Sequence, residues 1–92
     1  MGWSAARKPR RSVDGLARVV AIELLTAARG LHLRAPLRPA AATGAVVELL
    51  AAHAAGVPGP DRWLAPEIDA AHRLTADGSV LAAVERVSGP LA

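Results

Sequence analysis

The sequence contains no cysteine, no phenylalanine and no tyrosine, and its only aromatic residues are two tryptophans. Without cysteine, the chain can form neither a disulfide nor a thiolate metal site. Alanine supplies 22 of the 92 residues, and this residue favours helices but contributes little volume to a core. A domain of this size buries only about two-thirds of its unfolded surface. We therefore expect helices that need partners rather than a self-sufficient core.

Long apolar runs are also absent. The longest one is interrupted by Glu23 and is far shorter than the roughly 20 residues that a membrane span requires. The basic start is not followed by the apolar stretch and cleavage site of a signal peptide. We expect a soluble, cytoplasmic chain that does not enter a membrane.

The patterns that are present predict an all-α chain, because no alternating strand pattern and no internal repeat occurs. We expect three to four helices, over about residues 4–29, 43–55, 66–77 and 79–87.

Capping residues suggest where these helices begin and end. Gly30 is a good residue to follow the first helix, and Thr43 and Ser79 are suitable N-caps for the second and the last. Pro66 suits the first position of the third helix. Pro9 conflicts with an uninterrupted first helix, so we expect the helix to begin or bend there.

Glu23 is the candidate site residue. It lies in the apolar run of residues 19–28, and a helix that is apolar on nearly every side should be buried all round. Burying an unpaired carboxylate costs several kcal/mol or more, so such an acid is a candidate for a functional site. The alternative is that Arg18, Arg29 or a charge on another chain neutralises it in a purely structural role.

Other polar residues give no complete catalytic motif. The histidines, His32, His53 and His72, are too scattered for a metal site, and we expect them to be solvated or to cap helices. The basic cluster at residues 7–11 has no neighbouring aromatic residue to stack on bases. We expect it to be a solvated or interface-facing helical turn, with nucleic-acid binding as the weaker alternative.

Four blocks in order carry a family resemblance. They are residues 1–8 (MGWSAARK), 16–25 (LARVVAIELL), 27–34 (AARGLHLR) and 61–68 (DRWLAPEI). Together they resemble the C-terminal region of histidine ammonia-lyase and its aromatic amino acid lyase relatives.

The resemblance implies a mostly helical homotetramer in which long helices of neighbouring subunits form a common bundle. It implies elimination of ammonia from histidine, phenylalanine or tyrosine by an electrophilic methylidene-imidazolone group formed from an internal Ala-Ser-Gly tripeptide. Glu23 matches the family's glutamate near the substrate, so the resemblance implies a catalytic role for it.

The sequence departs from the family in ways that limit this expectation. It contains no Ala-Ser-Gly and no tyrosine. It therefore cannot form the electrophile, and it lacks the family's catalytic tyrosine. We expect a C-terminal segment that is inactive alone and associates with itself or with the rest of a lyase. We expect it to bind an amino-acid substrate only as part of a complete enzyme. Histidine is the preferred substrate. A phenylalanine or tyrosine lyase, or a non-catalytic helical interaction module, is the alternative.

Overall fold

The computed structural model describes the backbone of residues 2–91 and the side chains of residues 11–91. Its helices are α1 (Gly2–Leu33), α2 (Ala41–Ala52), α3 (Ala65–Ala76) and α4 (Ser79–Ser88). No strand occurs in residues 2–91. The expected all-α class is confirmed, and the four helices lie within the expected range of three to four.

Helix α1 is longer than expected at both ends. It begins at Gly2, runs through Pro9, and continues past Gly30 to Leu33. The expectation that Gly30 follows the helix is wrong, because Gly30 is helical and is not among the glycines with positive φ. A glycine inside a helix costs only about 1 kcal/mol relative to alanine, and Ala28 and Leu31 on either side pack onto the rest of the chain.

Two expected N-caps are also wrong. Helix α2 begins at Ala41, so Thr43 lies within its first turn, and no side chain caps it. Helix α4 is preceded by Gly78 at φ 86°, and the Asp77 Oδ1 accepts a hydrogen bond from the Ser79 N–H at 2.8 Å. Ser79 is therefore the first helical residue, and Gly78 holds the N-cap position. Pro66 does lie in the first two positions of α3.

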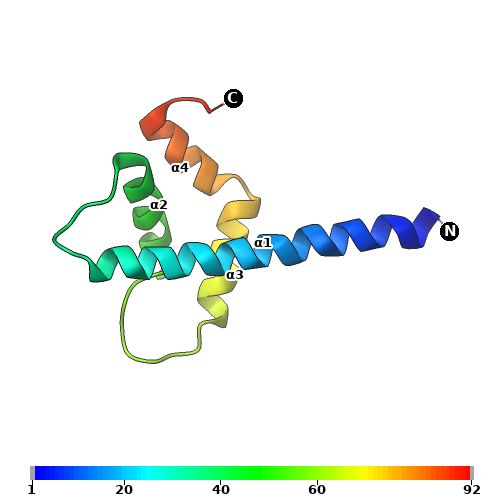
Figure 1. The fold of residues 1–92 in the computed structure, drawn as a ribbon, viewed down its shortest axis with the longest axis horizontal. Coiled ribbons are helices and arrows are strands. Elements are labelled where there is room, and N and C mark those ends of the chain that lie inside the picture. The colour runs from blue at the N-terminus through cyan, green and yellow to red at the C-terminus, as the bar shows by residue number, and fades with distance from the viewer. Residues whose placement is uncertain (1, 92) are drawn as a thin grey trace.

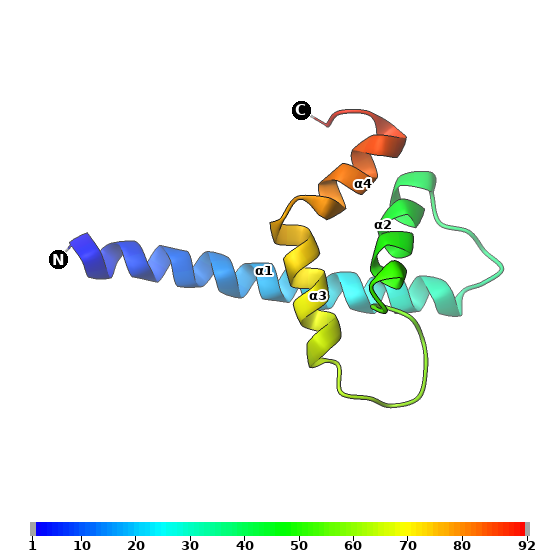
Figure 2. The same ribbon diagram turned by 180° about the vertical axis from the view of Figure 1, so that it is seen from behind.

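The helices form a thin layer, 55 × 37 × 17 Å in extent. Helix α1 crosses α3, and α2 packs beside α4 (Figures 1 and 2). The N-terminal half of α1 projects beyond the other helices. Since one helix with its side chains is about 10–12 Å across, a layer of 17 Å leaves little room for an interior.

The core lies where α1, α2 and α3 meet, and it is built largely of alanine. Its buried members are Ala21, Leu25, Ala28, Leu50, Ala55, Ala71 and Leu74. Alanines let helices approach closely but remove little apolar area from water, so each adds far less than a buried leucine. The expectation of a core with little bulk agrees with this cluster.

The apolar side chains of α4 are only partly covered. Val80 and Val84 are half-buried, but Leu81 and Val87 are each 51% exposed. The buried residue of this helix is Ala83. The side of α4 that carries Val80, Ala83 and Val84 is thus the one turned toward the other helices, while Leu81 and Val87 lie in solvent.

Candidate functional site

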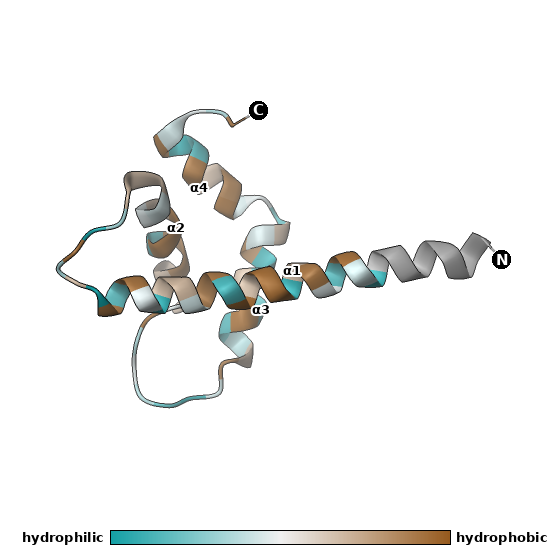
Figure 3. Ribbon diagram, viewed as in Figure 1, coloured by the Kyte–Doolittle hydropathy of each residue, from teal (hydrophilic) through white to brown (hydrophobic). Residues whose placement is uncertain are grey.

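Glu23 is exposed in this chain, and the expectation that its helix is buried all round is wrong. Only one side of α1 packs inward, through Ala21, Leu25 and Ala28. Val19 and Ile22, on the same apolar run, are exposed. The apolar run is visible along the middle of α1 where it crosses α3 (Figure 3).

Glu23 lies in the middle of an exposed apolar stripe, which we call the α1 seam. Its members repeat at alternating intervals of three and four residues, the spacing that places side chains along one side of a helix. They are Val13, Leu16, Val20, Glu23, Ala27 and Gly30, and all are exposed. The side chains become smaller toward Gly30, so a second helix could approach most closely beside and beyond Glu23.

No neutralising partner for Glu23 is found among residues 11–91. Arg18, one expected partner, pairs instead with Asp69 of α3, at 3.1 Å between Nη1 and Oδ1. Arg29 forms no ion pair with Glu23 within that range. The structural explanation based on these two arginines is therefore wrong, and among the side chains of residues 11–91 Glu23 is an unpaired carboxylate on an apolar surface.

The buried carboxylate of the described residues is that of Glu67, which is 7% exposed. It lies in the first turn of α3. Its Oε2 accepts a hydrogen bond from Arg62 Nε at 2.7 Å, and its Oε1 accepts bonds from Arg62 Nη2 at 3.1 Å and from the Gly56 N–H at 3.0 Å. This bidentate contact satisfies both oxygens.

The electrostatics of this cluster favour the ion pair. Hydrogen bonding by the Arg62 guanidinium holds the pKa of Glu67 below its ordinary value, against the opposing effect of burial, and the Gly56 N–H acts in the same direction as Arg62. Glu67 in turn raises the pKa of Arg62. The cluster holds a stable charge pair and shows none of the raised carboxyl pKa typical of a general acid.

Residues 61–68 carry this buried pair, which the sequence analysis did not single out. An arginine five residues before a glutamate, with a proline at the start of a helix between them, was the available signal. That spacing crosses from a connector into a helix, so no helical periodicity relates the two residues. Only the path of the connector brings them together.

The histidines do not converge on a site. The His53 Nδ1 lies 3.0 Å from the Leu49 carbonyl oxygen, within its own helical turn. His32 has a buried Nε2 without a hydrogen-bond partner in the described part of the chain, and His72 lies on α3. Residues 11–91 contain no group of three or more His, Asp or Glu residues that could hold a metal ion.

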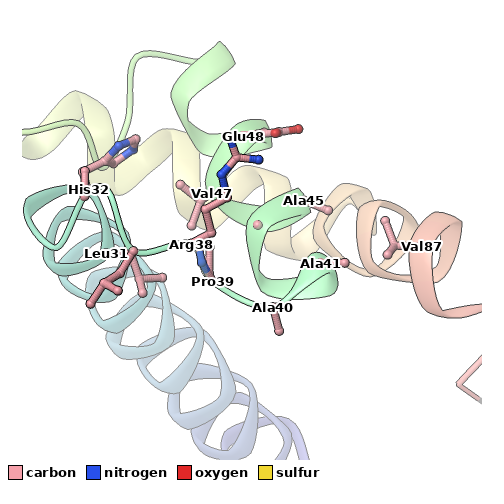
Figure 4. Close-up of a pocket in the computed structure, with 13 residues that line it drawn as sticks. Leu31, His32, Arg38, Pro39, Ala40, Ala41, Ala45, Val47, Glu48 and Val87 are labelled. Atoms are coloured by element: carbon pink, nitrogen blue, oxygen red, sulfur yellow. The ribbon is translucent and has the colours of Figure 1, made fainter.

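An open pocket of about 590 Å³ lies between the end of α1, the following connector and α2 (Figure 4). His32, Arg38 and Glu48 are its polar residues, and Val47 and Val87 contribute to its apolar wall. Glu23 does not line it. The pocket therefore does not join the candidate carboxylate to other titratable groups.

The basic cluster of residues 7–11 lies in the N-terminal part of α1. The side chains of residues 7–10, most of the basic cluster, lie outside the described ones, while Arg11 is exposed. Within the described residues, no helix combines the length and the apolar character needed to cross a membrane.

Comparison with known proteins gives consistent matches. Residues 1–52 match the family model of aromatic amino acid lyases. The whole chain is 56% identical to a histidine ammonia-lyase of Streptomyces griseus, and 99% of it is 57% identical to one of Streptomyces coelicolor. A histidine ammonia-lyase of Symbiobacterium thermophilum is 46% identical over 99% of the chain. No solved structure matches.

These matches cover a small part of each relative. The chain spans 18% of the length of each of the three histidine ammonia-lyases, and it corresponds to their C-terminal region. The fold described above is thus that of a histidine ammonia-lyase-like segment.

Proposed function

Because the chain belongs to the aromatic amino acid lyase family, we propose that it supplies the C-terminal helices and one active-site carboxylate of a histidine ammonia-lyase. The complete enzyme would convert L-histidine to urocanate and ammonia, breaking the Cα–N bond and removing a proton from Cβ. The chain would be inactive without the rest of the enzyme. Its relatives with matches across the chain carry the name of this activity.

The observation that carries this proposal is the position of Glu23. An exposed carboxylate between Val20 and Ala27 on the α1 seam would be taken out of water by any helix that packs there. A desolvated carboxylate binds a cation strongly. Glu23 would then hold the substrate ammonium or imidazolium and accept a proton during elimination.

The electrophilic group of the family does not fit this chain. The full sequence contains no Ala-Ser-Gly tripeptide, from which the methylidene-imidazolone is formed. We therefore assign no step of the reaction to a group made by these 92 residues. The electrophile would be supplied by the partner polypeptide.

The partner in this proposal is the rest of a lyase polypeptide, assembled as a cytoplasmic homotetramer. The seam supports an association between helices, because intervals of three and four residues match the packing of helices at small crossing angles. The thin, alanine-rich layer supports it too, since it encloses little apolar volume by itself.

The direct test is complementation. The chain would be co-expressed with the Streptomyces griseus relative truncated before the matched segment, and urocanate formation would be measured in the co-purified complex. Wild-type chain should restore turnover. Glu23→Gln should lower kcat about 100-fold or more, the usual range for a lost general acid or base.

Glu48→Gln is the matched control, because Glu48 is an exposed glutamate on α2. It should leave turnover within about twofold of wild type. Turnover by the isolated chain would refute the claim that it is inactive alone. An unchanged kcat in Glu23→Gln would refute the catalytic role.

A second candidate is a helical interaction module without catalysis. The exposed seam would serve that function equally well, since a helix can dock on it whether or not Glu23 meets a substrate. A complex that forms through the seam but shows no urocanate formation with wild-type chain would favour this reading.

A further inference from the structure

Trp63 is the most exposed large apolar side chain in the described part of the chain, at 83%. It lies near the end of the connector from α2 to α3, residues 53–64. This connector arches away from the helices on the side of α1 opposite α4 (Figures 1 and 2). Tryptophan carries the largest apolar surface of any side chain, so leaving it in water forgoes a large hydrophobic gain.

Hydrogen bonds link the connector around Trp63 to the first turn of α3. The neighbouring Arg62 donates hydrogen bonds to the carbonyl oxygens of Val57 at 2.6 Å and Pro60 at 3.5 Å, and pairs with Glu67. Gly56 donates to the same carboxylate. The network thus joins residues 56, 57, 60 and 62 to the first turn of α3.

An exposed tryptophan on a hydrogen-bonded connector has the properties of a binding anchor. Tryptophan is enriched among the residues that dominate interface energies. Ordering a loop before association reduces the entropy that binding must offset. The Arg62 network provides that ordering within this chain, before any partner is present.

We propose that Trp63 is an anchor that inserts into an apolar pocket on the rest of the lyase polypeptide. This rests on the proposed function and adds a second contact region, separate from the α1 seam. The chain covers 18% of the Streptomyces griseus relative, so the other 82% of that polypeptide lies outside the matched segment. In the relative, the matched segment and that portion are joined in one polypeptide and occur in equal number, which favours that portion over a second copy of the chain as the occupant.

The test uses the complex of the chain with the truncated Streptomyces griseus relative, assembled from the two separately purified polypeptides. The chain would carry Trp3→Phe, so that Trp63 is its only tryptophan, and would be labelled with 5-fluorotryptophan before mixing with unlabelled partner. The ¹⁹F resonance should respond to exchange of H₂O for D₂O in the free chain and lose that response in the complex.

Dissociation of the co-purified complex gives the second readout. Trp63→Ala should raise the dissociation rate at least about tenfold, as expected for an anchor residue, and Trp63→Phe should restore part of the loss. Leu81→Ala, which removes an apolar side chain that is 51% exposed on α4, should change the rate less than twofold. The helical circular dichroism of each free variant checks that it folds.

The outcomes separate the two proposals. A complex in which Trp63 stays solvent-sensitive and Trp63→Ala dissociates like wild type would overturn the anchor and leave the proposed function standing. Failure of any complex to form would refute both. Protection of Trp63 in the free chain at rising concentration would show that a second copy is the occupant and would overturn this assignment.

Discussion

The Glu67 carboxylate and the Arg62 guanidinium form a two-point contact, with Oε2 2.7 Å from Nε and Oε1 3.1 Å from Nη2. The contact ties the α2–α3 connector to the first turn of α3. Glu67 is buried while the Arg62 side chain is one-third exposed, so the arginine shields the carboxylate from water at the surface of the fold.

Glu67→Ala should destabilise the chain by about 2 kcal/mol, because it leaves the Gly56 N–H and the Arg62 guanidinium without their acceptor. Denaturant unfolding followed by circular dichroism gives this value. Asp69→Ala is the control, since Asp69 forms an exposed ion pair with Arg18, and such pairs contribute about 0–1 kcal/mol. Equal losses in the two variants would contradict the assigned role of Glu67.

Acid should weaken the fold through the same pair. The pKa of Glu67 is lower in the folded chain than its ordinary value, so the unfolded chain binds the proton more readily. The stabilisation that ionised Glu67 provides is complete above the ordinary glutamate pKa. It is lost as the pH falls through the lowered pKa of Glu67 in the folded chain. Melting temperature measured from neutral to acidic pH should fall, and the Glu67→Gln profile should be flatter.

Asp77 contributes to that pH profile with the same sign. Hydrogen bonds from Ser79 lower the pKa of Asp77. Asp77→Asn should therefore also reduce the fall in melting temperature at acidic pH. A wild-type melting temperature that rises on acidification would contradict both assignments.

Two glycines should respond oppositely to alanine. At Gly56, φ is +74° and an added Cβ would lie 2.8 Å from the Ala28 Cβ, so Gly56→Ala should cost about 2 kcal/mol or more. At Gly30, no atom lies within 4 Å of an added Cβ and the residue is helical. Gly30→Ala should therefore stabilise the free chain by about 0.5–1 kcal/mol.

Unfolding midpoints of the two variants test this contrast. The Gly30 result also tests where α1 ends. A glycine in a left-handed position after a helix would lose stability on replacement by alanine, so destabilisation by Gly30→Ala would place the end of α1 at residue 29.

Leu50→Ala should destabilise the chain by about 2–5 kcal/mol, which would unfold much of a chain this small. Leu50 is the one large side chain of residues 11–91 that is fully buried. Thermal unfolding of this variant should be compared with that of Leu81→Ala. Because the Leu81 side chain is exposed, its removal should change the free energy of unfolding by less than about 0.5 kcal/mol. Similar melting temperatures would contradict the assigned core.

Residues 53–64 and the α1 seam show how far the sequence could predict the site. The identity of Glu23 as a candidate came from its apolar neighbours and the family blocks. Its exposure could not be predicted, because an apolar run indicates that a helix will be covered and does not say by which polypeptide. The Arg62–Glu67 pair was missed because it depends on the path of a connector, which has no periodicity.

The sequence by itself determined the all-α class, the family and a range of three to four helices, because helix propensity, prolines and short sequence blocks are local properties of the chain. Tertiary structure decided which carboxylate is buried and which is exposed. Glu23 stays in water because only the opposite side of α1 packs against other parts of the chain, which include alanines of α3. The side that carries Glu23 contacts no other element within residues 11–91. Glu67 is buried because the connector folds Arg62 back over it, a contact that no local pattern encodes.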